Sequence, residues 1–532
     1  MKKVTVYTGL VLFYLLLFTV AAEGWVRLFR LAPPAAAPGF FWHAPDPQTG
    51  WALEPNAEGR WFNPMYEYDV PVTINALGLR SPAIDYVKAP GVYRVLTLGD
   101  SYVEGLQTPL AETFPQQLAQ ELTQHLDANV KVEVISAGVS GWGTDQQLLW
   151  LRAEGASYQP DLVLLAFYPG NDFMNNYMPL EFSNFGSVRK PWFALDKGVL
   201  QLHDFPFDPA QARDTARRLR REQARPANTT TDEAAVRPLQ PVGHWLKGRS
   251  ALYRYLDPRL RVVMPRAARR LVRWGLLEAG QESSDATHGP AHIPVTYGVY
   301  HQPPSAEWEA AFTLTGRLLT ALRDEVQDIG AKMGAVLLTA PEQVDPERWP
   351  RTLAQYPAMQ QETWALDGPT QRALALLAAA KIPTLDLLPL FRQATADGVQ
   401  LHLADDGHWT RTGHQLAGMA TAQFVVEQNW LPLSSPLPPL TWRHTRAVRE
   451  WLLWIIVGLL GVSLLWSVYK NGPVIWLRQM GVALGTVYEL VYYMVQRRQF
   501  ILLPVLLILL LFGGLLVIAQ ASVVGPFIYT LF

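Results

Sequence analysis

The chain has 532 residues, 49% of them hydrophobic, with 45 basic and 46 acidic side chains. This length allows one large core with appended segments, and the near-neutral charge does not indicate a nucleic-acid partner. Cysteine is absent, which excludes disulfides, thiol catalysis and cysteine-ligated metal sites.

The amino-terminal residues predict a membrane anchor. Val4 to Ala22 is an apolar run long enough to span a bilayer, and two lysines precede it. Val20-Ala21-Ala22 is also typical of a signal-peptidase site, so a cleaved signal is the alternative. Because the run is long for a signal, we expect an uncleaved transmembrane anchor over residues 1–30. A linker and lead-in over residues 31–74 would follow it.

Residues 75–430 predict an α/β domain. The expected strands are Tyr93–Leu98, Val130–Ile135, Leu162–Phe167, Ala335–Leu338 and Ile382–Leu388. The expected helices are Phe114–Leu126, Thr144–Glu154, Ser305–Asp328 with Ser305 as N-cap, and Gly413–Asn429. Five strands joined by helical crossovers predict a parallel sheet flanked by helices, a flavodoxin-like three-layer sandwich.

Polar blocks follow three of these strands. Gly99-Asp100-Ser101 ends the first strand, Gly170-Asn171-Asp172 ends the third, and Asp405-Asp406-Gly407-His408 comes after the last. Each block alone is common in turns. Active sites of open α/β sheets gather at the carboxyl ends of the strands, so the three blocks together predict a catalytic site.

In order and context these blocks resemble the SGNH hydrolases, also called the GDSL esterase/acyltransferase superfamily. The resemblance covers roughly residues 75–430 and implies that Ser101 is the nucleophile. It also implies an oxyanion hole made by the Ser101 N–H, Gly141 and Asn171. The Asp-x-x-His motif of the family falls on Asp405 and His408. The sequence departs from the family at Ser136, where asparagine often opens the second block.

These residue types suit acyl transfer. A serine hydroxyl becomes a good nucleophile when an imidazole takes its proton and a carboxylate orients that imidazole. A metal site is the rival interpretation of the histidines and aspartates near residue 408, since both residue types bind zinc. Those residues are His402, Asp405, Asp406, His408 and His414. The metal interpretation leaves the serine and asparagine blocks unexplained, so we expect no metal and no cofactor.

An insertion over residues 173–304 is not needed by the core fold. Its stretches Arg213–Arg225 and Arg249–Arg273 are rich in arginine, whereas Asn228 to Asp232 is typical of a flexible polar loop. The arginines fit a solvated helix face, contact with anionic lipid headgroups, or a lid over a polymer substrate. The sequence leaves these alternatives open.

A proline-rich linker over 431–450 leads to a predicted membrane module over 451–532. Trp451–Tyr469 and Phe500–Ala519 are long enough to span a bilayer, and Val474–Val495 fits a helix in the interface or a further span. Three spans would place the catalytic domain and the C terminus outside a bacterial inner membrane. We therefore expect a periplasmic active site.

The last residues resemble small bacterial membrane proteins that end in Pro-Phe-Ile-Tyr-Thr-Leu-Phe, and the partner of a membrane-bound O-acyltransferase (MBOAT) channel. That resemblance implies that Tyr529 carries an acyl group. An interfacial aromatic is the alternative. Together the features predict an O-acyltransferase that acts with an MBOAT partner and delivers an acyl group, most simply acetyl, to an extracytoplasmic glycan. The alternatives are an anchored esterase acting on glycans or lipids, and a non-catalytic scaffold.

Overall fold

The computed structural model describes residues 19–28, 43–63, 67–125, 130–222, 239–277 and 293–431, with the single residues 32, 437 and 440. The chain divides into two compact units, residues 1–30 with 444–532, and residues 31–443. Within the described residues, no helix is both long and apolar enough to cross a bilayer. The predicted spans over 451–469 and 500–519, the interfacial segment 474–495 and most of the span over 4–22 lie outside the described residues.

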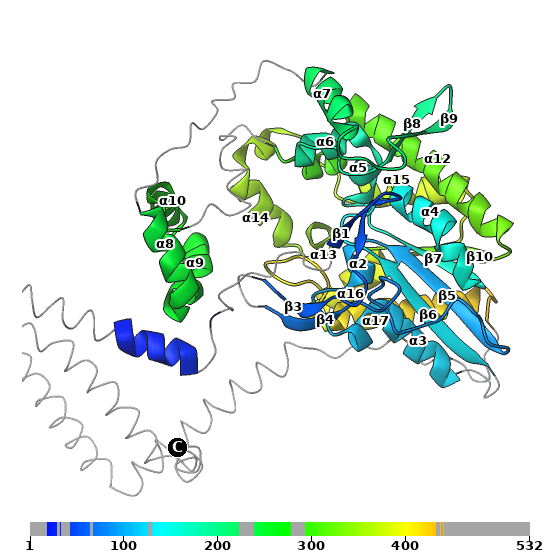
Figure 1. The fold of residues 1–532 in the computed structure, drawn as a ribbon, viewed down its shortest axis with the longest axis horizontal. Helices are drawn as coiled ribbons and strands as arrows, with labels where there is room; N and C mark the ends of the chain where they lie inside the picture. The colour runs from blue at the N-terminus through cyan, green and yellow to red at the C-terminus, as the bar shows by residue number, and fades with distance from the viewer. Residues whose placement is uncertain are drawn as a thin grey trace, which may run out of the picture. The chain divides into compact units, whose positions relative to one another are not determined.

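A five-stranded parallel sheet forms the centre of the larger unit, as predicted (Figure 1). Its strands, in spatial order, are β11 (Thr384–Asp386), β10 (Lys332–Leu337), β7 (Leu162–Phe167), β5 (Val92–Gly99) and β6 (Lys131–Gly138). In chain order this is the 2-1-3-4-5 arrangement of flavodoxin-like sheets. The last strand is shorter than predicted, because its final apolar residue, Leu388, begins a helix.

Helices cover both faces of the sheet (Figure 1). One face packs against α4 (Thr144–Ala153), α12 (Ala306–Asp328) and α15 (Gly368–Ala379), and the other against α3 (Phe114–His125), α16 (Leu388–Ala396) and α17 (Arg411–Glu427). Within β5, Leu96 and Leu98 join the first cluster and Val95 joins the third. Successive side chains point to opposite faces, so one apolar strand serves both layers.

The remaining helical segments connect these elements. In the larger unit they are α2 (Ser101–Glu104), η1 (Leu110–Glu112), η2 (Gly155–Tyr158), α13 (Pro341–Val344), α14 (Arg348–Gln355) and η4 (Pro357–Gln361). The described part of the smaller unit is a helix over 19–28. The predicted N-cap of α12 is confirmed, because the Ser305 hydroxyl accepts a hydrogen bond from the Trp308 N–H at 3.4 Å. This bond satisfies one of the first-turn donors of α12.

The segment predicted as a lead-in contains two β-hairpins. β1 (His43–Asp46) pairs with β2 (Gly50–Leu53), and β3 (Glu58–Phe62) pairs with β4 (Asp69–Thr73), both antiparallel. Leu53, Val72 and Ile74 are buried in the same apolar cluster as the sheet. The described residues of this lead-in, 43–63 and 67–74, are therefore part of the folded domain.

The insertion contains elements that pack on the α/β domain and a separate group of three helices, α8 to α10. Its elements are α5 (Asp172–Asn176), α6 (Met178–Phe185), β8 (Trp192–Asp196), β9 (Val199–His203), α7 (Ala212–Glu222), α8 (Gln240–Arg249), α9 (Ala251–Val263), α10 (Pro265–Trp274) and η3 (Val295–Tyr300). α5 and α6 contribute Phe173, Met174 and Leu180 to the central core, and a small apolar cluster joins α6, β8 and α7. Residues 172–222 thus pack on the α/β domain.

Candidate active site

The carboxyl ends of β5 and β6 lie next to each other and leave room for the short helix α2. Gly99 pairs with Gly138 across the two strands. A Cβ atom on either glycine would lie 2.4 Å from side-chain atoms of Val103. Only glycine permits this close approach of α2 to the strand ends. Asp100 caps α2 by accepting a 3.0 Å hydrogen bond from Tyr102 N–H, and Ser101 is the first residue of the helix.

Ser101 and His408 meet although 307 residues separate them in the chain. The Ser101 Oγ lies 2.8 Å from His408 Nε2, and His408 Nδ1 lies 2.5 Å from the Oδ1 atom of Asp406. Since the carboxylate accepts the proton on Nδ1, Nε2 is left as the lone-pair nitrogen that faces the serine. This is the geometry of a Ser-His-Asp triad.

The carboxylate partner of His408 is Asp406, so the sequence prediction of Asp405 is wrong in this contact. Residues 403–408 form a tight turn in which Leu403 N–H donates to the His408 carbonyl, and Gly407 has a φ of +85°. The turn brings the carboxylate two residues before His408 back onto the ring. Asp405 is exposed and its Oδ2 lies 3.5 Å from Asn63 Nδ2.

The surroundings shift the pKa values of His408 and Asp406 in opposite directions. Burial of the His408 ring opposes its protonation, but the hydrogen bond and negative charge of Asp406 outweigh burial and raise the pKa of His408. Burial alone would raise the pKa of Asp406. The hydrogen bond and positive charge of His408, together with the hydrogen bond from Tyr68, outweigh burial, and the pKa of Asp406 is lowered. The carboxylate therefore stays ionised, and the imidazole is a stronger base than a free histidine.

Three residues of the lead-in segment hold the Asp406 turn, and the sequence analysis missed them. The Tyr68 hydroxyl donates to Asp406 Oδ2 at 2.6 Å. The Glu67 carboxylate accepts from three successive backbone N–H groups, at 2.8 Å from Ala404, 3.1 Å from Asp405 and 3.0 Å from Asp406. It also accepts from Asn63 Nδ2 at 2.8 Å. The pattern Asn63 to Tyr68 contains no motif, so only the fold reveals this role.

The predicted oxyanion-hole residues lie around the same strand ends. The Ser101 N–H is the first N–H of α2 and has no carbonyl partner within the helix. Asn171, after β7, directs its Nδ2 to Asp100 Oδ2 at 3.2 Å, next to the nucleophile. Asp100 is fully buried, and burial raises its pKa. The hydrogen bond to Asp100 thus positions the Asn171 amide beside the residue that precedes Ser101.

Gly141 lies in a turn that is tied to α2. Ser140 donates to Glu104 Oε2 through its N–H at 2.6 Å and its hydroxyl at 2.5 Å. Gly141 itself has a φ of +80°, which favours glycine. Its carbonyl accepts from Asn175 Nδ2 at 2.6 Å. These bonds fix the position of the Gly141 turn relative to the helix that begins with Ser101.

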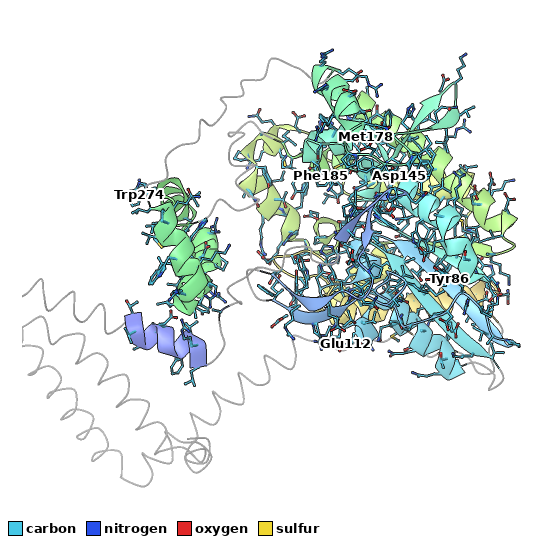
Figure 2. All side chains as sticks on the ribbon, viewed as in Figure 1. Tyr86, Glu112, Asp145, Met178, Phe185 and Trp274 are labelled. Atoms are coloured by element: carbon cyan, nitrogen blue, oxygen red, sulfur yellow. The ribbon has the colours of Figure 1, made fainter. Side chains whose placement is uncertain are left out.

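A buried charge cluster supports this turn from the insertion side. The Lys190 ammonium is fully buried and lies 2.7 Å from Asp145 Oδ2, 2.7 Å from the Asn175 carbonyl and 3.7 Å from Glu181 Oε2. Burial raises the pKa of Asp145, and Lys190 opposes that rise. Asp145, labelled in Figure 2, is fully buried. Glu181 is also paired with Arg189 at 3.1 Å, so removing the ammonium alone would leave the buried Asp145 carboxylate without its counter-charge.

The other histidines of the predicted metal alternative lie in separate buried positions. His402 contacts Thr339 and His414 accepts from Phe114 N–H at 3.3 Å. Burial lowers the pKa of His402 to about 4 and that of His414 to about 3. Across the described ranges, no group of three or more potential ligands is arranged to hold a metal ion.

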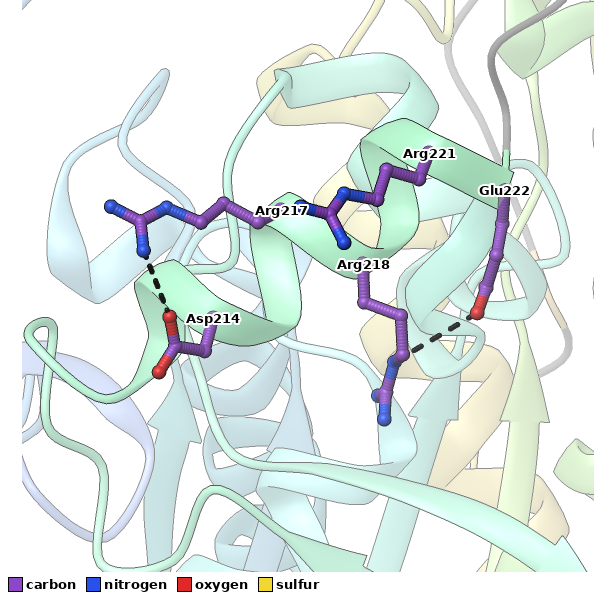
Figure 3. Close-up of a pocket in the computed structure, with 5 residues that line it drawn as sticks. All are labelled: Asp214, Arg217, Arg218, Arg221 and Glu222. Carbon is purple, nitrogen blue, oxygen red and sulfur yellow. Dashed lines mark hydrogen bonds and ion pairs between the residues drawn. The ribbon is translucent and has the colours of Figure 1, made fainter.

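The surface depression in Figure 3 does not belong to this site. Its lining residues are Asp214, Arg217, Arg218, Arg221 and Glu222, all on α7. Arg217 pairs with Asp214 at 3.2 Å, and Arg218 with Glu222 at 3.9 Å. The side chains are largely exposed, so this face fits the predicted solvated helix surface.

Tyr529, the predicted acyl carrier, lies outside the described residues.

Comparison with known families gives two matches. Residues 301–448 match the model described as "SGNH hydrolase-like domain, acetyltransferase AlgX". Residues 484–532 match a family of unknown function, DUF5989. No curated protein matches the chain.

Solved structures similar to the chain include three hydrolases. A lipase/acylhydrolase from Enterococcus faecalis is 13% identical, with a TM-score of 0.29, and the match covers 65% of this chain and 100% of that one. The acetyl xylan esterase AlAXEase is 11% identical, with a TM-score of 0.27 and coverage of 62% and 99%. A catalytic mutant of Axe2, an acetylxylan esterase from Geobacillus stearothermophilus, is 11% identical, with a TM-score of 0.27 and coverage of 65% and 99%.

Proposed function

We propose that this chain, which contains an SGNH hydrolase-like domain, is a serine O-acyltransferase that delivers an acyl group, most simply acetyl, to a hydroxyl of an extracytoplasmic glycan. The observation that carries the proposal is the contact chain from Ser101 Oγ through both nitrogens of His408 to Asp406. The match of residues 301–448 to a model described as an acetyltransferase supports transfer over simple hydrolysis.

The first half-reaction forms an acyl-enzyme. The Ser101 oxygen attacks the carbonyl carbon of the donor ester while His408 Nε2 takes the hydroxyl proton. The resulting tetrahedral intermediate collapses, the bond to the donor oxygen breaks, and His408 returns its proton to that oxygen. Asp406 keeps its negative charge and stabilises the imidazolium throughout.

The second half-reaction uses the same groups. His408 takes the proton of a sugar hydroxyl, whose oxygen attacks the acyl carbon of the Ser101 ester. The sugar–acyl bond forms, the bond to Ser101 Oγ breaks, and His408 returns the proton to the serine. In both halves the Ser101 N–H, the Gly141 N–H and the Asn171 amide would donate to the oxyanion, each donor being worth roughly 3 kcal/mol.

The acyl group needs a donor outside the cytoplasm. We propose that an MBOAT-type membrane partner exports it and that Tyr529 receives it as a phenyl ester. A phenol has a pKa near 10 and leaves more readily than a sugar hydroxyl, which favours transfer from Tyr529 to Ser101. Predicted spans over 4–22, 451–469 and 500–519 would anchor the chain in a bacterial inner membrane with the active site in the periplasm.

Hydrolysis is the alternative outcome, because water in place of the sugar gives an esterase with the same residues. The experiment is a product analysis of the purified full chain with an aryl acetate donor and soluble neutral and uronate oligosaccharides as acceptors. Mass spectrometry should find acetylated oligosaccharide, and its yield should rise with acceptor concentration while free acetate falls. Release of acetate alone at every acceptor concentration would identify an esterase. No reaction by the wild type would indicate a scaffold.

A further inference from the structure

Helices α8, α9 and α10 pack against one another as a small helical unit, residues 239–277 (Figure 1). The Leu239 N–H at the start of α8 donates to the Trp274 carbonyl at the end of α10, at 2.9 Å. The Tyr253 hydroxyl on α9 donates to the Leu276 carbonyl at 2.6 Å. A Cβ at Gly243 would lie 2.4 Å from the Gly275 carbonyl oxygen, so α8 packs tightly on the end of α10.

This unit carries a strong positive charge. Residues 239–277 contain nine lysines and arginines and a single acidic residue, Asp257, a formal charge of +8. The whole chain has a net charge of −1, so the rest of the chain carries −9. Asp257 is already paired with Arg261 at 2.7 Å. The charge is therefore concentrated in one short segment, where it favours an anionic partner.

Large apolar side chains are exposed on the same unit. Trp245 is 59% exposed, Met264 53% and Trp274 52%, and Val242 and Leu256 are also exposed. These five are among 13 exposed large hydrophobic residues in the described chain, although the unit has only 39 residues. Exposed apolar residues that gather in one short segment are a feature of interaction surfaces, whereas scattered single ones are ordinary.

Both tryptophans lie toward one end of the unit. Val242 and Trp245 are three residues apart and share a face of α8, within the first turns after Leu239. Leu239 is the residue that donates to the Trp274 carbonyl, so the start of α8 and the end of α10 are adjacent. Figure 2 labels Trp274 at the end of α10. Val242 and Trp245 on α8 and Trp274 on α10 are thus carried by adjacent helix ends of this basic unit.

We propose that residues 239–277 dock on the interfacial region of an anionic phospholipid bilayer. Tryptophan is enriched at the level of lipid headgroups, and basic side chains pair with lipid phosphates while their aliphatic stems stay in the apolar zone. A polyanionic glycan would satisfy the charges but offers no hydrocarbon for Met264, Val242 and Leu256. The docked unit would hold the adjoining α/β domain at a membrane surface, whichever reaction that domain catalyses.

The absence of cysteine allows a local test in the full chain. Val242→Cys, labelled with the fluorophore NBD, leaves both tryptophans in place. Val199→Cys is the matched control, because Val199 is 59% exposed on β9, outside the helical unit. The protein is reconstituted into, or mixed with, vesicles of phosphatidylcholine alone or with 30% phosphatidylglycerol. The position-242 label should shift to shorter wavelength and be quenched by brominated lipid only with phosphatidylglycerol, and the position-199 label should do neither.

Charge removal supplies a second readout. Arg259→Gln with Arg270→Gln should lower the docking equilibrium of the position-242 label about 25-fold, at about fivefold for each basic residue near an anionic surface. Arg217→Gln with Arg218→Gln on α7 is the matched control and should leave it unchanged. Water-like emission at position 242 with both lipids would overturn the proposal. So would a shift caused by dextran sulfate without lipid, which would identify a polymer-binding surface instead.

Discussion

Replacing each of two neighbouring aspartates separates the geometry of the active site from the motif spacing. Asp406→Asn removes the carboxylate that lies 2.5 Å from His408 Nδ1, and Asp405→Asn makes the same chemical change one residue away, on an exposed side chain. Both variants keep the backbone N–H groups that bind Glu67. The pair is therefore matched in size, charge change and local backbone.

The expected loss follows from the proton on the imidazole. An asparagine amide can donate to His408 Nδ1, which moves the ring proton to Nε2, and Nε2 then has no lone pair to accept the proton of Ser101. In serine enzymes of this design such a change lowers kcat by roughly 10⁴, about 5 kcal/mol of transition-state stabilisation. Asp405→Asn should change kcat by less than about threefold, under about 0.7 kcal/mol.

The assay is steady-state hydrolysis of an aryl acetate, followed from pH 5 to 9. Since Asp406 raises the pKa of His408, and neutral His408 is the active form, the wild-type kcat/KM should fall as the pH drops through that raised pKa. The residual activity of Asp406→Asn should have its acid limb at lower pH, because the charge that raised the pKa is gone. Equal activity of Asp406→Asn and wild type, or a large loss in Asp405→Asn, would refute this assignment.

Three further predictions concern other parts of the site. Ser101→Ala should abolish labelling by a fluorophosphonate and acyl turnover while circular dichroism stays unchanged, and near-normal turnover would remove Ser101 from the mechanism. Tyr68→Phe should lower kcat about tenfold at unchanged KM, because it removes a hydrogen bond to the ionised Asp406, worth about 1.5 kcal/mol; Tyr86→Phe, whose hydroxyl bonds Glu154, is the control and should match wild type. Tyr529→Phe should stop glycan acylation in cells but leave aryl acetate hydrolysis intact, and normal glycan acylation would exclude the carrier.

The sequence alone predicted the parallel sheet and two residues of the triad, Ser101 and His408. Uninterrupted apolar runs such as Leu162–Phe167 can be satisfied only by burial on both faces, and this requirement produces a parallel sheet covered by helices. Parallel strands end at one edge, which places Ser101 directly after β5 at that edge. His408 is separated from β11 by α16, so its approach to the serine was implied by the order of the motif blocks. Ser101 and His408 are indeed in contact at 2.8 Å.

The choice between Asp405 and Asp406 was decided only by tertiary structure. The two adjacent aspartates have the same side chain and lie three and two residues before His408. Which one faces the ring depends on the backbone dihedral angles of the turn that contains Gly407. That turn is held from outside by Glu67 and Tyr68, more than 330 residues away in the chain. A carboxylate that accepts backbone N–H groups leaves no sequence pattern, because it recognises main-chain atoms common to every residue. Such supports become visible only when the chain has folded.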